Sequence, residues 1–125
     1  MSAEENKALI LRMFESGNQE NLAETEEFIA PTIVVHDVDK PDVHGNYQGH
    51  QDFLTWSNAT FSGQTTIEDI TAEGDTVVVR ATFHGIQKSE WNGRPAGQEV
   101  TFTGITTYRI VDGKVVESWH KHLTW

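Results

Sequence analysis

Side chains able to transfer protons gather near the C-terminal end of the chain. His120, Lys121 and His122 are consecutive, and His36 stands in an earlier β-branched segment. Histidine titrates near neutral pH, and a lysine amine can act as a base when desolvation lowers its pKa. His36, Lys121 and His122 are therefore the candidate catalytic residues. The plainer alternatives are a strand-end histidine held by solvent and a lysine that reaches the rim.

The His120-x-His122 spacing places two imidazoles on one face of a strand, a spacing that can chelate a metal ion. A tetrahedral site needs further ligands than this pattern shows, and the chain has no cysteine. A metal site at this pair is thus the least favoured alternative, and we predict neither a metal nor a cofactor. No phosphate-binding glycine loop, nucleotide motif or Ser-His-Asp order is present.

Length and composition limit the possible partners. The chain has 125 residues, which fits a single domain over residues 1–125, and its net charge is -10. This charge would repel a phosphate backbone or an anionic membrane surface, so we expect no nucleic acid and no membrane. The absence of cysteine is compatible with a reducing compartment, and the acidic N-terminal residues do not resemble a signal peptide. We therefore expect a soluble, cytoplasmic protein.

The elements that would position these side chains are helical first and extended later. Ser2 and Glu5 have capping-box spacing, and apolar residues then recur at helical spacing as far as Gly17. The remaining expected elements are a short helix from Asn21 to about Ile29, a strand over 32–38, a loop over 39–48, a helix over 49–61, and strands over 65–73, 76–86, 99–111 and 114–122.

The four final strands form a meander with one face to bury, and the helices are the only partners available to cover it. The sequence therefore predicts an α+β fold in which a curved antiparallel sheet wraps around the N-terminal helices as a cone-shaped roll. A pocket for a small apolar or aromatic molecule is expected between the sheet and the helices.

The Asp112-Gly113 pair is the strongest hairpin signal in the chain. A two-residue loop there pairs Val111 with Lys114, and counting outward pairs Tyr108 with Glu117, Thr106 with Trp119, Gly104 with Lys121 and Phe102 with Leu123. The last eight of these residues, together with Ile110 and Val115, are assigned to the inner face because they are richer in large apolar side chains. The opposite face then carries Thr101, Thr103, Thr107, Arg109, Ser118, His120 and His122.

This register places Lys121 in the interior, across from the space that Gly104 leaves empty. A charge at such a position is costly unless it is paired or functional, which favours a ligand site. The alternative is that Lys121 and Glu117 reach solvent at the sheet end. The residues expected to contact the ligand are Phe53, Trp56, Phe83, Phe102, Thr106, Tyr108 and Trp119.

Three stretches resemble one known family. They are residues 46–53 (NYQGHQDF), residues 74–80 (GDTVVVR) and residues 107–119 (TYRIVDGKVVESW), in the same order as in that family. On these motifs the chain is similar to SnoaL-like polyketide cyclases. The resemblance implies the nuclear-transport-factor-2-like fold, usually as a homodimer, and its cyclases run an intramolecular aldol condensation with an acid/base aspartate and no cofactor.

The chain departs from the family pattern in two places. The aspartate that many relatives carry four residues after the tryptophan of the closing strand is Leu123 here. Residues 85–87 read Gly-Ile-Gln where many relatives read Gly-Thr-His.

Two functional hypotheses stay open. The first is a cofactor-independent enzyme of the cyclase type, acting by acid/base chemistry on a small, flat, largely apolar molecule. The second is a non-catalytic module that binds such a molecule, motivated by Leu123 in the aspartate's place. If the protein is an enzyme, His122 can reach the cavity only if the last strand bulges by one residue, whereas Lys121 needs no such change.

Overall fold

The structure is a computed structural model that describes residues 2–37, 40–45, 47–91 and 93–124; the side chains of residues 37, 40–45, 47–50, 53 and 124 lie outside the description. The elements are α1 Ala3–Asn18, α2 Leu22–Glu27, β1 Ile29–Asp37, β2 Lys40–Gly45, α3 Tyr47–Thr60, β3 Phe61–Glu73, β4 Thr76–Gln87, β5 Glu99–Val111 and β6 Lys114–Thr124. Among the described helices, none is both long and apolar enough to span a membrane.

The N-terminal helices begin where the sequence predicts. The Ser2 hydroxyl accepts a hydrogen bond from the Glu5 backbone N–H, and the Glu5 carboxylate accepts one from the Ser2 backbone, which confirms the capping box. Asn21 caps α2 by accepting from the Glu24 backbone N–H at 3.2 Å. The buried Ser16 and Thr25 hydroxyls lie 2.7 Å apart and join the two helices.

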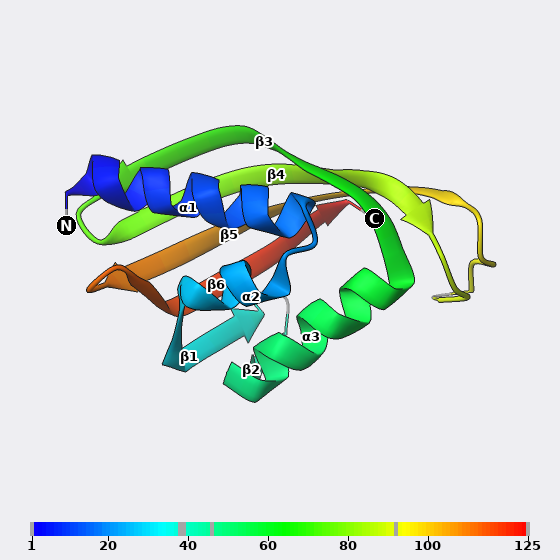
Figure 1. Cartoon of the computed structure of the whole chain (residues 1–125), viewed down its shortest axis with the longest axis horizontal. Coiled ribbons are helices and arrows are strands. Elements are labelled where there is room, and N and C mark those ends of the chain that lie inside the picture. The colour runs from blue at the N-terminus through cyan, green and yellow to red at the C-terminus, as the bar shows by residue number, and fades with distance from the viewer. Residues whose placement is uncertain (1, 38–39, 46, 92, 125) are drawn as a thin grey trace.

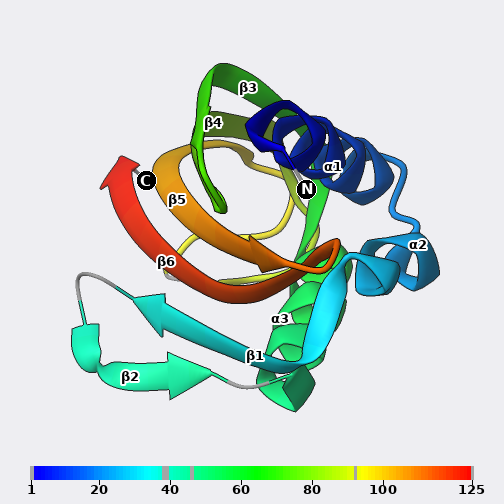
Figure 2. The ribbon, with the colours of Figure 1, turned by 90° about the vertical axis from the view of Figure 1, so that its left-hand side faces the viewer.

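The six strands form one curved sheet in the order β2-β1-β6-β5-β4-β3 (Figure 1). The last four strands pair as an antiparallel meander, as predicted, while β1 pairs parallel to β6. Seen end-on, the sheet curls so that the helices occupy its concave side (Figure 2). The predicted α+β roll is thereby confirmed: α1 contacts β3 and β4, and α3 contacts β1 and β3.

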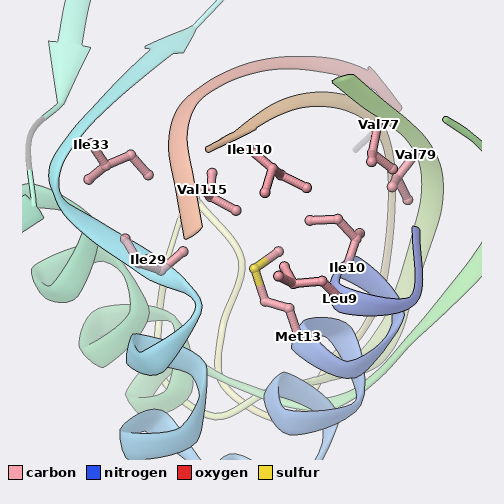
Figure 3. Packing of buried hydrophobic residues seen from close by; sticks show 9 residues of the cluster. All are labelled: Leu9, Ile10, Met13, Ile29, Ile33, Val77, Val79, Ile110 and Val115. Atoms are coloured by element: carbon pink, nitrogen blue, oxygen red, sulfur yellow. The ribbon is translucent and has the colours of Figure 1, made fainter. Parts of the chain in front are cut away.

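The hydrophobic core lies between α1 and the half of the sheet that ends at the Asp112-Gly113 hairpin (Figure 3). Its buried members are Leu9, Ile10, Met13, Ile29, Ile33, Val77, Val79, Ile110 and Val115. Because strand side chains alternate between faces, the inward residues Val77 and Val79 of β4 continue into Ala81 and Phe83 beyond the core. The core therefore fills one end of the roll and leaves the other end to a cavity.

One expected loop contains a strand. Residues 39–48 were predicted to be irregular because of Pro41, Gly45 and Asn46, but residues 40–45 form β2, which pairs antiparallel with β1. Proline is tolerated on an edge strand, where one side of the backbone has no ladder partner, and β2 is an edge of the sheet. The prediction of a loop throughout 39–48 is therefore wrong.

The predicted β5–β6 register is also wrong beyond the first two residue pairs of the hairpin. Asp112 and Gly113 adopt φ values of 51° and 76°, and Val111 pairs with Lys114 as expected. Ile110 then pairs with Val115 but Arg109 pairs with Glu117, so that Val116 is an extra residue in β6. The bulge reverses the faces of the β6 residues from Glu117 to His122, and Gly104 lies opposite His122 instead of Lys121. A second register shift follows, since Thr103 pairs with Thr124.

The bulge has a physical reason. Without it, Glu117, Trp119 and Lys121 would face the interior, where two charges would lose their hydration. With it, the inward positions of β6 after Val115 are Ser118, His120 and His122.

A pair of glycines lets β3 bend where it leaves α3, a bend that Figure 1 shows. Gly63 pairs with Gly85, and a Cβ added at Gly63 would lie 2.3 Å from the His84 carbonyl oxygen and 2.5 Å from the Gly85 Cα. Both contacts are with backbone, so the strands would have to separate to admit a side chain.

We predict that Gly63→Ala lowers the free energy of unfolding by about 2–3 kcal/mol, because the added methyl group overpacks a rigid backbone contact. The matched control is Gly17→Ala in α1, where an added Cβ meets no atom within 4 Å. That change should be neutral or should raise stability by up to about 1 kcal/mol, since alanine favours helix. Urea unfolding measures both, and equal effects of the two substitutions would contradict the predicted overpacking.

Candidate functional site

A cavity of about 490 Å³ opens on the concave side of the sheet. The C-terminal part of α1 and residues of α3 line it from one side, and β3, β4, β5 and β6 line it from the other. Among the lining residues in the described part of the chain there is no lysine or arginine, and Glu20 is the one carboxylate. The cavity therefore offers mainly aromatic rings, hydroxyl groups and imidazoles to a ligand.

One end of the cavity is built from aromatic rings of five different segments: Trp56 of α3, Phe61 of β3, Phe83 of β4, Trp91 of the loop after β4, and Phe102 of β5. Phe61 is central, with its ring centroid 5.4 Å from that of Trp91 and 5.3 Å from that of Phe102. Phe83 and Phe102 stack at 6.1 Å across the β4–β5 pair. Flat faces and edges of this kind suit a flat apolar ligand.

The wall beside these rings is polar and comes from β5 and β6. His120 Nδ1 lies 2.7 Å from the Thr106 hydroxyl oxygen, across the strand pair. The rings of His120 and His122 meet edge to face with centroids 4.7 Å apart. Gly104 leaves room for this arrangement, because a Cβ there would lie 3.0 Å from His120 Cε1. Two imidazoles thus occupy the cavity wall in a defined geometry.

Tyr108 extends the polar wall toward the core. Burial raises the pKa of the Tyr108 phenol, and a hydrogen bond with the Thr106 side chain acts in the opposite direction. The phenol therefore stays protonated at neutral pH. His120, Thr106 and Tyr108 form a chain of groups, each able to donate or accept a proton.

The structure brings together five of the predicted ligand-contacting residues and moves one away. Trp56, Phe83, Phe102, Thr106 and Tyr108 line the cavity. Trp119 lies on the opposite face of the sheet, stacked on His36 with ring centroids 5.4 Å apart, because the bulge reverses its orientation. The Phe53 side chain is outside the described part of the chain.

Of the three predicted proton-transfer residues, one lines the cavity and two lie outside it. His122 lines the cavity, as the bulged alternative required. Lys121 is exposed and His36 lies with Trp119 on the outer face, and neither is among the lining residues. The placement of Lys121 in the interior is therefore wrong, because it followed from the unbulged register.

His120, like His122, lines the cavity although the predicted register placed it on the outer face. Its i, i+2 relation to His122 was recognised, but both were assigned outward and weighed as metal ligands. The sequence did hold a signal for the inward assignment of this pair: the i, i+2 spacing together with the cost of burying Glu117 and Lys121 on the same face. Within the described residues, no group of three or more histidine or acidic side chains is placed to hold a metal ion.

Comparison with known protein families identifies the family of this chain. The model of the SnoaL-like polyketide cyclase family matches residues 8–122. The chain belongs to the SnoaL-like family. No curated protein matches the chain.

Solved structures agree with this membership. AclR, a proposed hydroxylase from Streptomyces galilaeus, is 30% identical with a TM-score of 0.88, over 98% of this chain and 91% of that one. IdmH, a proposed polyketide cyclase from Streptomyces antibioticus, is 26% identical with a TM-score of 0.83, over 94% and 91% of the two chains. An LEH-like epoxide hydrolase of M. tuberculosis shares the fold, at 13% identity and a TM-score of 0.77, over 97% and 84%.

This SnoaL-like chain differs from the family pattern at the end of β6. Leu123, at the position of the usual aspartate, is 38% exposed and does not line the cavity. The polar groups that do face the cavity from β6 are His120 and His122. Any proton transfer in this cavity must therefore use a group other than the family's aspartate.

The outer face of the same strands carries an ion-pair cluster of His36, Arg109 and Glu117. His36 Nε2 lies 2.7 Å from one Glu117 carboxylate oxygen, and Arg109 donates to the other at 3.1 and 3.2 Å. The His36 hydrogen bond lowers the pKa of the Glu117 carboxyl, burial opposes this, and Arg109 lowers it further. The cluster ties β1, β5 and β6 together directly after the bulge.

We predict that Glu117→Gln lowers the free energy of unfolding by about 1–2 kcal/mol near neutral pH, because it removes a charge-assisted, partly buried hydrogen-bond acceptor. The pKa of Glu117 is lower in the folded state, so its contribution is full above the unfolded-state pKa and is lost as the pH falls through the folded-state pKa. The stability difference between the parent and the variant should therefore shrink below about pH 4.

Urea titrations between neutral and acidic pH measure this difference. The matched control is Glu99→Gln, an exposed residue at the start of β5. A stability difference for Glu117→Gln that stays constant down to pH 3, or that equals the control at neutral pH, would contradict the role given to the cluster.

Proposed function

We propose that the protein is a cofactor-independent enzyme that transfers protons on a small, flat, largely apolar molecule held in the cavity. The observation that supports this most is the His120–Thr106 contact of 2.7 Å inside a cavity whose far end is aromatic. A binding cavity needs aromatic walls, but it has no need for an imidazole anchored by a hydroxyl. General acid/base catalysis needs such an anchored group.

The anchoring suits a group that both takes and returns a proton. When His120 donates its Nδ1 proton to Thr106 and Thr106 donates to the Tyr108 oxygen, the Nε2 atom is left with the basic lone pair. After Nε2 takes a proton, the Nδ1 hydrogen bond stays as it was. The Thr106–Tyr108 pair therefore holds one ring orientation through both halves of a proton-transfer cycle.

The order of side chains along β5 indicates how a molecule would lie. Phe102, Gly104, Thr106 and Tyr108 follow one another on the inner face. A strand rises about 3.3 Å per residue, so Phe102 and Thr106 are roughly 13 Å apart along the strand. A molecule of two or three fused rings can therefore reach from the aromatic end to His120.

The reaction class proposed is proton removal from a carbon beside a carbonyl group. His120 Nε2 takes the proton, and the electron pair moves to the carbonyl oxygen as an enolate. In a cyclisation the enolate carbon attacks a second carbonyl carbon of the same molecule, and the resulting alkoxide takes a proton from the imidazolium. The protons and electrons balance without a cofactor. The family membership supports this class because its model is that of polyketide cyclases.

The second candidate is a non-catalytic module that binds the same kind of molecule. The observation in its favour is Leu123 at the usual aspartate position. The homodimer and the cytoplasmic location expected from the sequence stay predictions. A single species of about 14 kDa in sedimentation at micromolar concentration would exclude the homodimer.

The test uses a flat two-ring ketone, 2-tetralone, whose C1 protons exchange with deuterated water by way of the enolate. The parent protein should accelerate this exchange, measured by proton NMR, above an equal concentration of free imidazole. His120→Gln should slow the protein-catalysed exchange by roughly 100-fold, because a positioned base is lost. His122→Gln should give a smaller loss, since the second ring packs against the first.

The matched controls are Lys121→Met and His36→Gln, which alter the neighbouring charge and the outer-face histidine. Both should keep the exchange rate within a few-fold of the parent. Parent-like exchange by His120→Gln would contradict the assignment of the base. Binding of 2-tetralone by the parent without any acceleration would favour the binding module.

A further inference from the structure

Gln87 is a fully buried polar side chain at the end of β4, with 0% of its surface exposed. Its side-chain nitrogen lies within hydrogen-bond distance of three carbonyl oxygens, those of Ser89, Trp91 and Arg94, at 2.9, 3.2 and 2.7 Å. All three belong to the loop between β4 and β5. Gln87 belongs to the Gly-Ile-Gln stretch that departs from the family pattern, and the proposed proton transfer does not use it.

The loop folds around this amide. Trp91 and Arg94 form a two-way backbone pair, with N–H to oxygen distances of 3.1 and 3.0 Å. The Gln87 backbone N–H donates to the Gln98 oxygen at 2.9 Å, and the Gln87 oxygen accepts from the Gly97 N–H at 2.7 Å. Both ends of the loop and its tip are thus fixed to one residue.

The chemistry at the centre of the loop requires a donor. Three carbonyl oxygens converge there, and a carboxylate in the same place would repel them. An apolar side chain of the same size would leave them without this shared donor in a buried position. Glutamine supplies the donor without adding a charge to the interior.

The loop in turn places Trp91 at the aromatic end of the cavity. The Trp91 ring lies 5.5 Å from that of Trp56 and 5.4 Å from that of Phe61, measured between centroids. Trp91 lines the cavity although it belongs to neither a helix nor a strand of the sheet. Its position therefore depends on the loop, and the loop depends on the Gln87 amide.

We propose that Trp91 is the end wall of the cavity and that Gln87 is the positioning residue that sets this wall, so that the pair determines the length of the flat molecule accepted. The inference rests on the proposed function only in that the cavity holds a flat molecule. It requires no proton transfer, and its test uses equilibrium binding alone.

The experiment measures the dissociation constants of two fluorescent probes of the same width, 2-naphthol with two fused rings and 2-hydroxyanthracene with three. Trp91→Ala removes the wall. It should therefore weaken the binding of 2-naphthol several-fold, because a ring contact is lost, and should tighten the binding of 2-hydroxyanthracene. The ratio of the two constants should change by about 10-fold in favour of the longer probe. Gln87→Met should move the ratio in the same direction by roughly 3-fold or more.

The matched control is Gln98→Met, the same chemical change at an exposed position of the same loop, and it should leave the ratio unchanged. A general loosening of the fold would weaken the binding of both probes, whereas loss of the wall would weaken the binding of one probe and tighten the binding of the other. Weakening of both probes alike, or a ratio equal to the parent's in Trp91→Ala, would overturn the inference and leave the proton-transfer proposal standing.

A measurement on the parent protein covers the case in which Gln87→Met fails to fold. The side-chain amide protons of Gln87 should exchange with solvent at least ~100-fold more slowly than those of Gln98, because they are buried and hydrogen-bonded. Equal exchange rates would overturn the positioning role of Gln87. Failure of the parent to bind either probe would overturn the end wall as well.

Discussion

The extra residue at Val116 is the constraint on which the site depends. Strand side chains alternate with a period of two, so one inserted residue exchanges the two faces of everything that follows. On one side of the bulge Val115 completes the core, and on the other side His120 and His122 enter the cavity. The same shift releases Lys121 to solvent and gives Glu117 its partners on the outer face. The inward position of the two histidines and the outer ion pairs are thus consequences of one local irregularity.

The inner face of the sheet then divides the protein into three zones. Apolar residues of β4, β5 and β6 meet α1 at the hairpin end, polar groups follow, and aromatic rings close the far end. The zones follow the chain along β5 from Ile110 through Thr106 to Phe102, so this one strand contributes a side chain to each zone. The helices complete the enclosure, and the loop after β4 adds Trp91 to the aromatic end.

Much of the fold could be predicted from the sequence because its signals are local. The capping box at Ser2, the Asp112-Gly113 turn and the alternation from Val77 to Phe83 each involve residues close together in the chain, and each is confirmed. The parallel β1–β6 pairing was missed because it joins distant segments with no turn signal between them. Strand β2 was missed because Pro41, Gly45 and Asn46 are typical of a loop. The bulge was weighed only as the condition for His122 to face the cavity and was left out of the assigned register, although that register buries Glu117 and Lys121 at a cost. Every misplaced site residue on β6 follows from that single omission, whereas the β5 residues Phe102, Thr106 and Tyr108 were placed correctly.

The bulge turns His120 and His122 into the cavity and leaves His36 and Lys121 outside it. NMR spectra of the histidine ring nitrogens, recorded while 2-tetralone is titrated into the uniformly 15N-labelled protein, test this claim most directly. The account predicts that the ring signals of His120 and His122 shift in proportion to occupancy while those of His36 and the exposed His84 stay in place. Shifts confined to His36, with the His120 and His122 signals unchanged at saturation, would contradict it.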